Sequence, residues 1–531
     1  MTSAAPEPPS NTPPSWQHCG QDATSADPVG CCGIHVPGHT ACLAHLADTD
    51  RDSYLNDLSP GADIDHRGTP FTEDLLHRLL TALHDPTTSQ AHIGTARFDW
   101  ATFTGDAWFR RATFTSEAWF DRATFASDAG FEGVTFTSNA WFRRATFTSD
   151  ARFDRVTFTG DARFDGATFT GHAGFDGATF TSNVSFGKVT FTSNAGFGGV
   201  TFTSDAVFNE ATFTSNARFD RATFTGDARF DWATFTGNAR FDEVTFTSDA
   251  RFDWATFTGD VWFRRATFTS DARFNGATFT SNARFDRARF ETTSRLGPLV
   301  CGEKVVLDGA VFDQPVTVEM AAREVSCART RWASTATLHL RYAEVDLRDA
   351  VLEYPVLVAA RPDPFPSLYS RDPLSEAELS GREPGVRLMS VGGVDAAHLA
   401  LHTIDLSMCR FAGAIHLDQL RVDGWCTFAT TPTDQGRRFP WRWSRRNTVS
   451  EEHHWRVRTA RRPARGHGWT TPPRDAPDLP PAAVATLYRQ ILPGRRADAG
   501  HRPAAATAPP APPAGTTPTT RPAPTAQRSP P

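Results

Sequence analysis

A phenylalanine recurs along the chain from Phe98 to Phe290 at alternating intervals of five and six residues, without interruption. Two residues before each phenylalanine of this series stands alanine or valine, and the positions between them are mostly Thr, Ser, Asp and Arg. The resulting 11-residue unit reads A-T-F-T-S-D-A-R-F-D-R. A helical period of 3.6 residues would scatter the phenylalanines around a helix, so the pattern predicts extended chain instead.

Extended chain explains which positions face the core. Residues i−2 and i share one face of a strand, and their neighbours share the other. The Ala/Val and Phe positions therefore point inward together, while Thr, Arg and Asp point outward. Val, Thr and Phe favour strands, and the Ser/Gly–Asp/Asn and Asp–Arg pairs favour turns. A closed coil of one unit would be too tight for two phenylalanines, so we expect four-sided coils of two units, 22 residues each.

The unit Ala101-Thr102-Phe103-Thr104-Gly105 has a small residue followed two positions later by a bulky apolar one. It resembles the repeat of the bacterial pentapeptide-repeat family. The resemblance covers residues 96–292 and implies an all-β solenoid, a right-handed quadrilateral β-helix. One departure is that every second unit carries an extra residue, such as Asp106 before Ala107. Regular square corners are therefore not expected on two sides of each coil.

A weaker form of the inward pair continues over residues 293–430. The first pairs recur at intervals of 20 residues: Val305/Leu307, Ala310/Phe312 and Val316/Val318, then Val325/Cys327, Thr330/Trp332 and Ala336/Leu338, then Val345/Leu347, Ala350/Leu352 and Val356/Val358. Residues 361–384, rich in Pro, Asp and Ser, predict a loop. The pairs then resume: Ile404/Leu406, Cys409/Phe411, Ile415/Leu417, Leu420/Val422 and Cys426/Phe428. We expect further coils, with Cys327, Cys409 and Cys426 as small core residues.

The region before the repeat, residues 67–95, predicts a helical cap. An open β-helix end exposes apolar side chains and unpaired strand edges, and so needs a cover. Thr69-Pro70 or Thr72-Glu73 is suited to begin the helix. Its apolar stripe would consist of Phe71, Leu75, Leu76, Leu79, Leu80 and Leu83.

Four of the eight cysteines stand within 24 residues, in a Cys/His-rich segment at 16–66. The first residues have neither a basic start nor an apolar core, so we expect no secretory signal and a reducing, cytoplasmic setting. Thiolates and imidazoles are the ligands that zinc prefers, and four would hold this core-poor segment together. The predicted structural zinc ligands are Cys19, Cys31, Cys42 and His45, with Cys32 or His39 as substitutes. The alternative is free thiols in an unstructured N-terminus.

Beyond the solenoid, segment 437–469 interleaves arginine with tryptophan. Such a segment can bind an anionic surface, either lipid headgroups or nucleic acid. The candidate contacts are Arg437, Arg438, Arg442, Arg445, Arg446, Trp441 and Trp443. The alternative is a solvated, partly docked linker over 431–480. A short helix is expected at 481–492, and residues 1–15 and 493–531 should be disordered.

Charge and the missing motifs narrow the function. The chain has a net charge of −6, and residues 98–290 contain 23 acidic and 20 basic side chains, which argues against a strongly acidic DNA mimic. DNA mimicry is the activity known for family members that inhibit gyrase. No apolar run approaches the ~18 residues of a membrane helix. We see no phosphate loop and no catalytic Ser-His-Asp or Cys-His set in the repeat.

We therefore expect a non-enzymatic, cytoplasmic scaffold that presents a rigid rod to a protein partner, with the arginine-rich segment as a route to a membrane surface. A nucleic-acid-mimicking or nucleic-acid-binding inhibitor is the alternative. A further alternative is ice binding, because outward threonines such as Thr102 and Thr104 form ladders that resemble ice-binding surfaces. Aligned tryptophans are candidates for a protein contact patch: Trp119 with Trp141 on one side, Trp108 with Trp262 on another.

Overall fold

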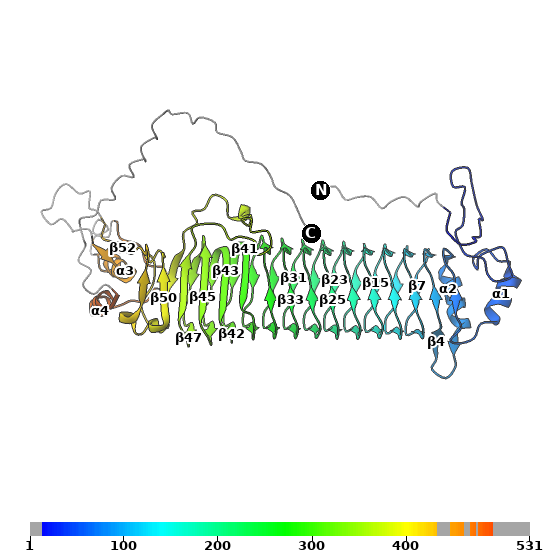
Figure 1. Cartoon of the computed structure of the whole chain (residues 1–531), viewed down its shortest axis with the longest axis horizontal. Coiled ribbons are helices and arrows are strands. Elements are labelled where there is room, and N and C mark those ends of the chain that lie inside the picture. The colour runs from blue at the N-terminus through cyan, green and yellow to red at the C-terminus, as the bar shows by residue number, and fades with distance from the viewer. Residues whose placement is uncertain (1–12, 433–445, 461–467, 474–475, 492–531) are drawn as a thin grey trace, which may run out of the picture. The chain divides into compact units, whose positions relative to one another are not determined.

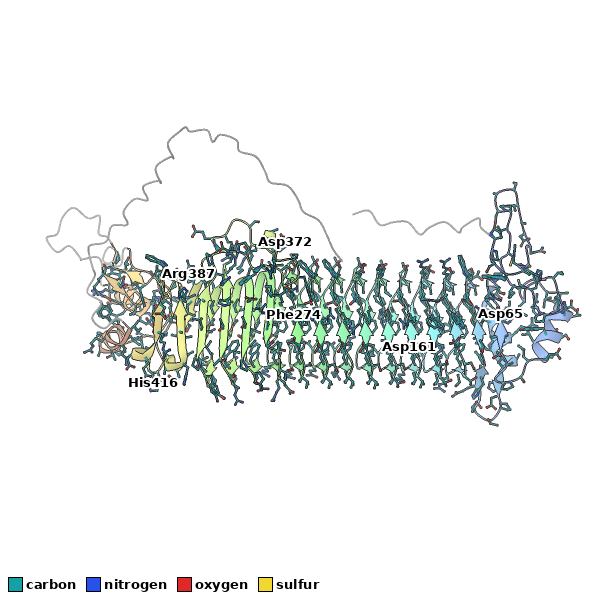
Figure 2. All side chains as sticks on the ribbon, viewed as in Figure 1. Asp65, Asp161, Phe274, Asp372, Arg387 and His416 are labelled. Atoms are coloured by element: carbon teal, nitrogen blue, oxygen red, sulfur yellow. The ribbon has the colours of Figure 1, made fainter. Side chains whose placement is uncertain are left out.

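The computed structural model describes residues 13–432, 446–460, 468–473 and 476–491. From residue 64 onward, parallel strands of successive coils stack along one axis as a four-sided β-solenoid (Figure 1). Side chains project from every coil (Figure 2). The predicted all-β solenoid is therefore confirmed. The expected disordered ends, apart from residues 13–15, lie outside the described residues.

The first side of the solenoid is a sheet of ten short strands in which Ala or Val points inward. These strands are β1 (Ile64–Asp65), β5 (Ala96–Arg97), β9 (Ala118–Trp119), β13 (Ala140–Trp141), β17 (Ala162–Arg163), β21 (Val184–Ser185), β25 (Ala206–Val207), β29 (Ala228–Arg229), β33 (Ala250–Arg251) and β37 (Ala272–Arg273). The third side has the same pattern. Its strands are β7 (Ala107–Trp108), β11 (Ala129–Gly130), β15 (Ala151–Arg152), β19 (Ala173–Gly174), β23 (Ala195–Gly196), β27 (Ala217–Arg218), β31 (Ala239–Arg240), β35 (Val261–Trp262) and β39 (Ala283–Arg284).

The second and fourth sides are built mainly from Thr-Phe strands. The second side contains β2 (Pro70–Phe71), β6 (Thr102–Phe103), β10 (Thr124–Phe125), β14 (Thr146–Phe147), β18 (Thr168–Phe169), β22 (Thr190–Phe191), β26 (Thr212–Phe213), β30 (Thr234–Phe235), β34 (Thr256–Phe257) and β38 (Thr278–Phe279). The fourth side contains β4 (Gln90–Ile93), β8 (Thr113–Phe114), β12 (Thr135–Phe136), β16 (Thr157–Phe158), β20 (Thr179–Phe180), β24 (Thr201–Phe202), β28 (Thr223–Phe224), β32 (Thr245–Phe246), β36 (Thr267–Phe268), β40 (Arg289–Phe290), β42 (Val311–Phe312), β44 (Arg331–Trp332) and β47 (Val351–Leu352). The short strand β3 (His84–Asp85) pairs antiparallel with β4.

The register confirms a coil of 22 residues, because Thr124 pairs with Thr146 and Phe125 with Phe147 in parallel strands. The phenylalanines from 98 to 290 are buried in the interior. Rings one coil apart stack, as Phe125 and Phe147 do with centroids 4.6 Å apart. Rings within a coil meet edge to face, as Phe131 and Phe142 do at 5.6 Å. Both arrangements suit the quadrupole of the ring.

The five-residue step between phenylalanines turns its corner through a left-handed residue. This residue stands two positions after the phenylalanine, as in Trp100 (φ 61°), Arg111 (φ 59°) and Lys188 (φ 57°). The turn is closed by hydrogen bonds such as that from Ala101 N–H to Phe98 C=O, 3.0 Å. Glycine, which adopts this conformation without strain, replaces the side chain at some corners, including Gly177.

The six-residue step explains the extra residue of every second unit. Its Asp or Asn side chain accepts a hydrogen bond from the backbone N–H of the same position in the next coil. Asp150 Oδ1 accepts from His172 N at 2.9 Å, and Asn139 Oδ1 from Asp161 N at 3.0 Å. The extra residue therefore supplies acceptors for backbone N–H groups at a corner between two sides, where buried donors need partners.

Longer strands replace the regular pattern after residue 293. They are β41 (Arg295–Val306), β43 (Val316–Ser326), β45 (Ala336–Arg341), β46 (Glu344–Asp346), β48 (Val356–Ala360), β49 (Arg387–Ser390), β50 (Leu399–His402) and β51 (Arg421–Asp423), with 3-10 turns η2 (Ala396–His398) and η3 (Leu417–Gln419). Val311 pairs with Arg331 and Thr337 with Leu357, so these coils advance by 20 residues as predicted. The predicted pairs between Val305 and Val358 are all buried.

The last coils depart from the prediction. Ile415 was expected to point inward but is exposed, and Leu420, Val422 and Cys426 are only half-buried, because the terminal coil has no further coil to cover it. The sequence pattern also missed one coil, directly after the loop. Its inward residues are Val386, Leu388, Val391, Val394, Leu399 and Leu401. The loop between β48 and β49 had broken the 20-residue spacing that identified the earlier coils.

That loop, residues 361–386, packs against the solenoid and is called the strap below. It contains η1 (Ala377–Leu379), and its apolar side chains Phe365, Leu374 and Leu379 pack with Val300 and Ala321 of the coils. It is fastened by a buried ion pair between Arg341 Nε and Glu376 Oε1, 2.6 Å apart. The strap thus has a small core of its own.

The N-terminal end is covered by α1 (Asp48–Asn56) and α2 (Glu73–Ala82). Thr72 begins α2, since its hydroxyl accepts from Leu75 N at 3.2 Å, as one of the two predicted starts requires. Leu75, Leu76 and Leu79 are buried in the same core as the solenoid phenylalanines. Phe71 was wrongly assigned to the helix: it lies in β2 and pairs with Phe103, because its spacing fits the inward position of a first coil.

The C-terminal end is also covered. Described here are β52 (Ala429–Thr430), β53 (Asn447–Thr448), α3 (Ser450–Thr459) and α4 (Pro481–Ile491). Glu451 is buried, and its Oε1 accepts hydrogen bonds from Phe411 N at 2.6 Å and Ala412 N at 2.9 Å. Residues 446–460, expected to belong to a linker, are therefore a docked cap, because their acidic and small polar side chains satisfy open backbone groups of the last coils.

Candidate metal centre and interaction surfaces

Four ligand atoms converge at the N-terminal end of the chain. The Sγ atoms of Cys19, Cys31 and Cys42 and a ring nitrogen of His45 all lie within 4.8 Å of one another. Among the described residues this is the one group of three or more such side chains placed to hold a metal ion. It is the set chosen first from the sequence, and these four residues could hold a metal.

The spacings match a tetrahedral zinc site. Cys31 Sγ lies 3.7 Å from Cys42 Sγ, and His45 Nδ1 lies 3.4 Å from the Sγ atoms of both Cys19 and Cys42. A tetrahedron with Zn–S bonds of about 2.3 Å and a Zn–N bond of about 2.0 Å has ligand separations of about 3.8 Å between sulfurs and about 3.5 Å between sulfur and nitrogen. The four side chains therefore stand close to the distances that a single zinc ion sets.

Local backbone structure brings the ligands together. Cys19 N donates to Gly33 O and Gly20 N to Cys31 O, both at 2.8 Å, so the first two ligands face each other across a pair of short extended segments. Cys42 and His45 lie in one tight turn, in which His45 N donates to Cys42 O at 2.9 Å. Gly33 lets that turn approach, because a Cβ there would lie 2.7 Å from Cys42 Sγ.

The two substitute ligands are not part of the group. Cys32 Sγ contacts Gly30 O instead, and burial raises the pKa of this thiol. His39 Nδ1 lies 3.8 Å from Asp50 Oδ2. Within the group, the hydrogen bond from Cys31 lowers the pKa of the Cys42 thiol, which favours the thiolate form that binds metals.

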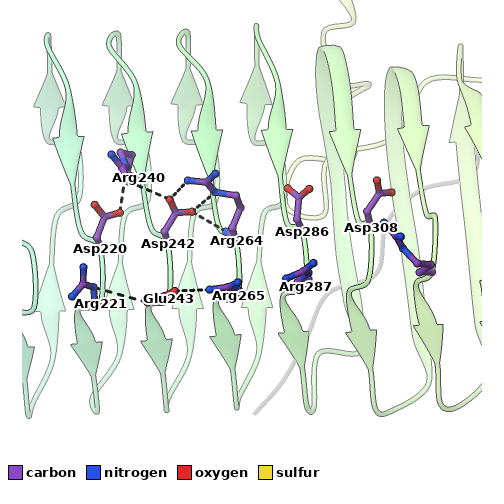
Figure 3. Close-up of a pocket in the computed structure, with 11 residues that line it drawn as sticks. Asp220, Arg221, Arg240, Asp242, Glu243, Arg264, Arg265, Asp286, Arg287 and Asp308 are labelled. Carbon is purple, nitrogen blue, oxygen red and sulfur yellow. Dashed lines mark hydrogen bonds and ion pairs between the residues drawn. The ribbon is translucent and has the colours of Figure 1, made fainter.

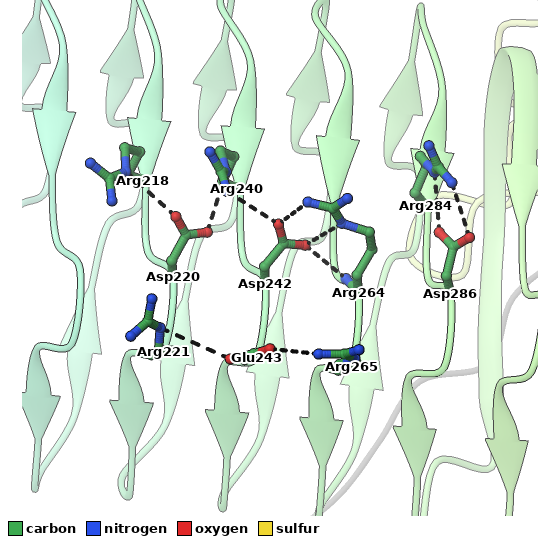
Figure 4. Close-up of polar contacts among 10 residues, drawn as sticks. All are labelled: Arg218, Asp220, Arg221, Arg240, Asp242, Glu243, Arg264, Arg265, Arg284 and Asp286. Atoms are coloured by element: carbon green, nitrogen blue, oxygen red, sulfur yellow. Dashed lines mark hydrogen bonds and ion pairs between the residues drawn. The ribbon is translucent and has the colours of Figure 1, made fainter.

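The charged side chains of the third side form ion pairs that link successive coils (Figure 4). Arg240 lies 3.4 Å from Asp220 of the preceding coil and 3.6 Å from Asp242 of its own. Arg264 repeats the arrangement, with Nη2 2.5 Å from Asp242 Oδ2. A polar groove runs along this row (Figure 3), lined by six arginines and five carboxylates. Near-balanced charge of this kind favours solubility over attraction of one class of polyion.

The outward threonines are also arranged in ladders, as predicted. In the Thr-Phe-Thr strands, the second threonine often turns its hydroxyl to the wall of the solenoid. Thr148 Oγ1 donates to Phe125 O and Thr214 Oγ1 to Phe191 O, each at 3.0 Å. These hydroxyl hydrogens are used within the fold and do not point to solvent, so this geometry gives no support to an ice-binding face.

Comparison with known families agrees with this architecture. A family model described as pentapeptide repeats (9 copies) matches residues 109–157, 153–201, 190–231, 208–253, 230–277 and 252–297. The repeat region of this chain belongs to the pentapeptide-repeat family. Searches of curated proteins and of solved structures found no significant match to the chain.

The pentapeptide-repeat solenoid exposes an aromatic patch that the sequence analysis missed. Trp232 is 58 % exposed and stacks on Trp254 with centroids 5.1 Å apart, and Tyr369 of the strap is 57 % exposed. The Tyr369 hydroxyl donates to Asp253 Oδ2 at 2.7 Å, beside Trp254, and Leu368 next to it is also exposed. These four residues, Trp232, Trp254, Leu368 and Tyr369, are called the aromatic patch. Periodicity gave one signal, since both tryptophans occupy left-handed corners, but the strap contact could not be read from it.

The predicted tryptophan pairs of the pentapeptide-repeat solenoid have different settings. Trp119 and Trp141 stack on the first side at 5.1 Å, as expected. Trp108 and Trp262 both lie on the third side, in β7 and β35. Arg110 covers the ring of Trp108 at 4.0 Å, so that this aromatic surface is partly occupied by a cation.

Most of the predicted anion-contact residues lie outside the described residues: Arg437, Arg438, Trp441, Arg442, Trp443 and Arg445. Arg446 is described and is engaged within the C-terminal cap. Its Nη2 lies 2.6 Å from Glu452 Oε1, and its guanidinium sits over the ring of Tyr488. Arg446 therefore fastens the cap. In the described part of the chain, no helix has the length and apolar character needed to cross a membrane.

Proposed function

We propose that this protein is a non-enzymatic scaffold whose pentapeptide-repeat solenoid holds a protein partner at a fixed place along its length. The aromatic patch carries the proposal. Exposed, closely grouped aromatic side chains are typical of protein interfaces, where they provide large buried area at a small entropic cost. The patch rests on a rigid base, because Trp254 packs against the small core of the strap.

The test compares two tryptophans at equivalent corners. Trp232→Gly removes the exposed ring from the patch, and glycine fits the left-handed backbone there (φ 62°). Trp100→Gly makes the same change at another left-handed corner (φ 61°) outside the patch. Wild type and both variants are immobilised, and proteins captured from lysate of the source cells are quantified by mass spectrometry. A partner retained by wild type and Trp100→Gly but lost by Trp232→Gly is expected. Equal capture by all three would contradict the proposal.

We further propose that the metal centre holds one structural zinc ion. The support is the match between the ligand spacings and tetrahedral zinc, together with the three sulfur donors, which favour zinc over magnesium or calcium. Bound zinc would add folding free energy to a segment with few apolar side chains.

Elemental analysis of the purified full-length chain should find about one zinc per molecule. Cys42→Ser should remove most of it, whereas Cys32→Ser, which changes a thiol outside the group, should retain it. Zinc content near zero in the wild type after growth in zinc-replete medium, or equal content in both variants, would end this proposal.

A further inference from the structure

We infer that the metal centre controls the closure of the N-terminal end of the solenoid, so that loss of the metal opens the first coil and leaves the rest of the rod folded. This inference rests on the proposed zinc site. It concerns what the metal regulates: a cover over the edge of a β-sheet. The segment that provides this cover, residues 16–46, is called the N-terminal module.

The module makes direct backbone contact with the first coil. Ile34 N donates to Arg67 O at 2.8 Å, at the corner between β1 and β2. Ile34 lies three residues after Cys31, so a metal ligand and an edge contact share one short segment. The backbone of β1 bonds onward to the second coil, with Ile64 N donating to Thr95 O. The module therefore covers the side of the first coil that has no preceding coil.

Close packing at Gly68 joins the two parts more tightly. A Cβ at Gly68 would lie 2.4 Å from Cys32 O, so the module backbone rests directly on the coil backbone. The same carbonyl accepts from Trp16 Nε1 at 2.9 Å, and the guanidinium of Arg67 lies over the ring of Trp16. A shift of the module by one or two ångströms would break these contacts together.

The second half of the ligand set is anchored in the core. Cys42 and Leu43 are fully buried, and Val36, Leu43 and Leu46 belong to the same apolar cluster as Phe71 and the helix α2. Arg51 of α1 donates from Nη2 to Leu46 O at 2.7 Å and from Nε to Leu43 O at 3.0 Å, which holds the turn that carries Cys42 and His45. The metal thus ties this buried turn to the segment with Cys19 and Cys31.

Without the metal, these two segments are joined mainly by a few backbone hydrogen bonds. Because each coil of a solenoid contacts only its neighbours, disorder at one end need not spread through the stack. We therefore expect local opening: the backbone of 64–71 loses its cover, while the central coils stay protected.

Hydrogen exchange with mass-spectrometric detection tests this on the full-length chain, before and after treatment with a zinc chelator and after addition of zinc. Peptides over 64–71 and 90–98 should exchange about tenfold faster or more after chelation, and recover with zinc. Peptides between 140 and 290 should change less than about twofold. Cys42→Ser should resemble the chelated protein, and Cys32→Ser the zinc-bound one. Val36→Ser, which keeps all four ligands, should bind zinc yet show faster exchange at 64–71.

The outcomes separate the two claims. If the purified protein contains no zinc, the zinc proposal fails and this inference fails with it. If zinc is present but its removal leaves exchange at 64–71 unchanged, the zinc site stands and the closure inference is overturned. Faster exchange throughout the solenoid after chelation would also overturn it, since the metal would then support the whole fold rather than one end.

Discussion

At the scale of single residues, each core phenylalanine takes part in two kinds of ring contact. Phe175 stacks between Phe153 and Phe197, both 4.9 Å away, and also meets Phe164 and Phe186 edge to face. Contacts along the axis hold coil to coil, and contacts across it hold side to side. Fixed spacing of the phenylalanines is therefore a requirement of packing in two directions.

Substitution of Phe175 should be costly but local. Phe175→Ala removes a buried ring from the middle of the stack and is expected to lower stability by about 3–5 kcal/mol. Phe175→Leu, which keeps more of the volume, should cost clearly less, and Phe175→Asp should cost most, because it buries a charge. Urea unfolding of the three variants measures the order. Equal midpoints for wild type and Phe175→Asp would show that the interior is not packed as described.

His66 should make the N-terminal end sensitive to acid. Burial lowers the pKa of His66 to about 4, partly opposed by Asp65, whereas the unfolded side chain titrates near 6.5. The folded form stays neutral while the unfolded form takes up a proton. The stabilisation is complete above pH 6.5 and is lost as the pH falls toward 4, by roughly 3 kcal/mol.

The measurement is hydrogen exchange of 64–71 between pH 7 and 4, corrected for intrinsic rates. Wild-type protection should fall with pH, and His66→Leu should flatten that dependence. A variant that keeps the full wild-type pH profile would place the sensitivity in another group.

At the scale of elements, the strap is an insertion fixed by few strong contacts. Arg341 and Glu376 are 4 % and 9 % exposed in their side chains, and Arg341 also donates to Arg361 O at 2.9 Å. An ion pair buried to this degree contributes little net stability, yet removal of one partner leaves an uncompensated charge. Attachment of the strap therefore depends on both partners being present.

Glu376→Ala should release the strap at a cost of about 3–5 kcal/mol, seen as faster tryptic cleavage after Arg371. The double variant Arg341→Met/Glu376→Leu removes both charges and should restore resistance to trypsin close to wild type. Cleavage of Glu376→Ala at the wild-type rate would show that the apolar contacts of Phe365 and Leu379 are sufficient alone.

Much of the fold was predictable because the repeat encodes it at each position. The five- and six-residue spacing of Phe fixed the inward faces and the 22-residue coil, and inward pairs extended the solenoid to Val358. The coil after the strap was missed because the insertion removed the spacing that the argument used. Phe71 was misplaced because an isolated apolar residue before a helix fits a helical stripe and a strand equally well.

The candidate site was predictable only in part. Ligand chemistry singled out Cys19, Cys31, Cys42 and His45, since three thiols and an imidazole in a short segment suit one metal. Their contact with the first coil could not be inferred, because Gly68 and Ile34 act through backbone atoms that no residue type reveals. The aromatic patch was missed for a related reason: Tyr369 reaches Trp254 only through the folded strap.

At the scale of the molecule, the solenoid is a stack of equivalent coils between two different covers. Helices α1 and α2 with the N-terminal module occupy one end, and α3 with α4 the other (Figure 1). Covers at both ends leave no free strand edge along the axis for another chain to extend. The number of coils between them is set by the sequence alone.

Removal of one whole coil should therefore be tolerated. Deletion of 174–195, 22 residues, joins Ala173 to Gly196 in the register that Ala195 has now, and should lower the melting temperature by only a few degrees. Deletion of 174–178 keeps the inward Ala-Thr-Phe pattern but leaves a three-sided coil, and should lower it much more. Circular-dichroism melting compares them, and equal losses would contradict a stack of interchangeable coils.

The left-handed corners have a consequence for how such a surface can change over time. The positions at Trp100, Arg111 and Lys188 hold their backbone shape whatever side chain they carry, since neighbouring carbonyls fix it. Their side chains can be exchanged among cationic, acidic and aromatic groups at one coil without disturbing the interior. The rod therefore behaves as a peg-board with a regular pitch, on which new recognition patterns can be written one peg at a time while the frame stays the same.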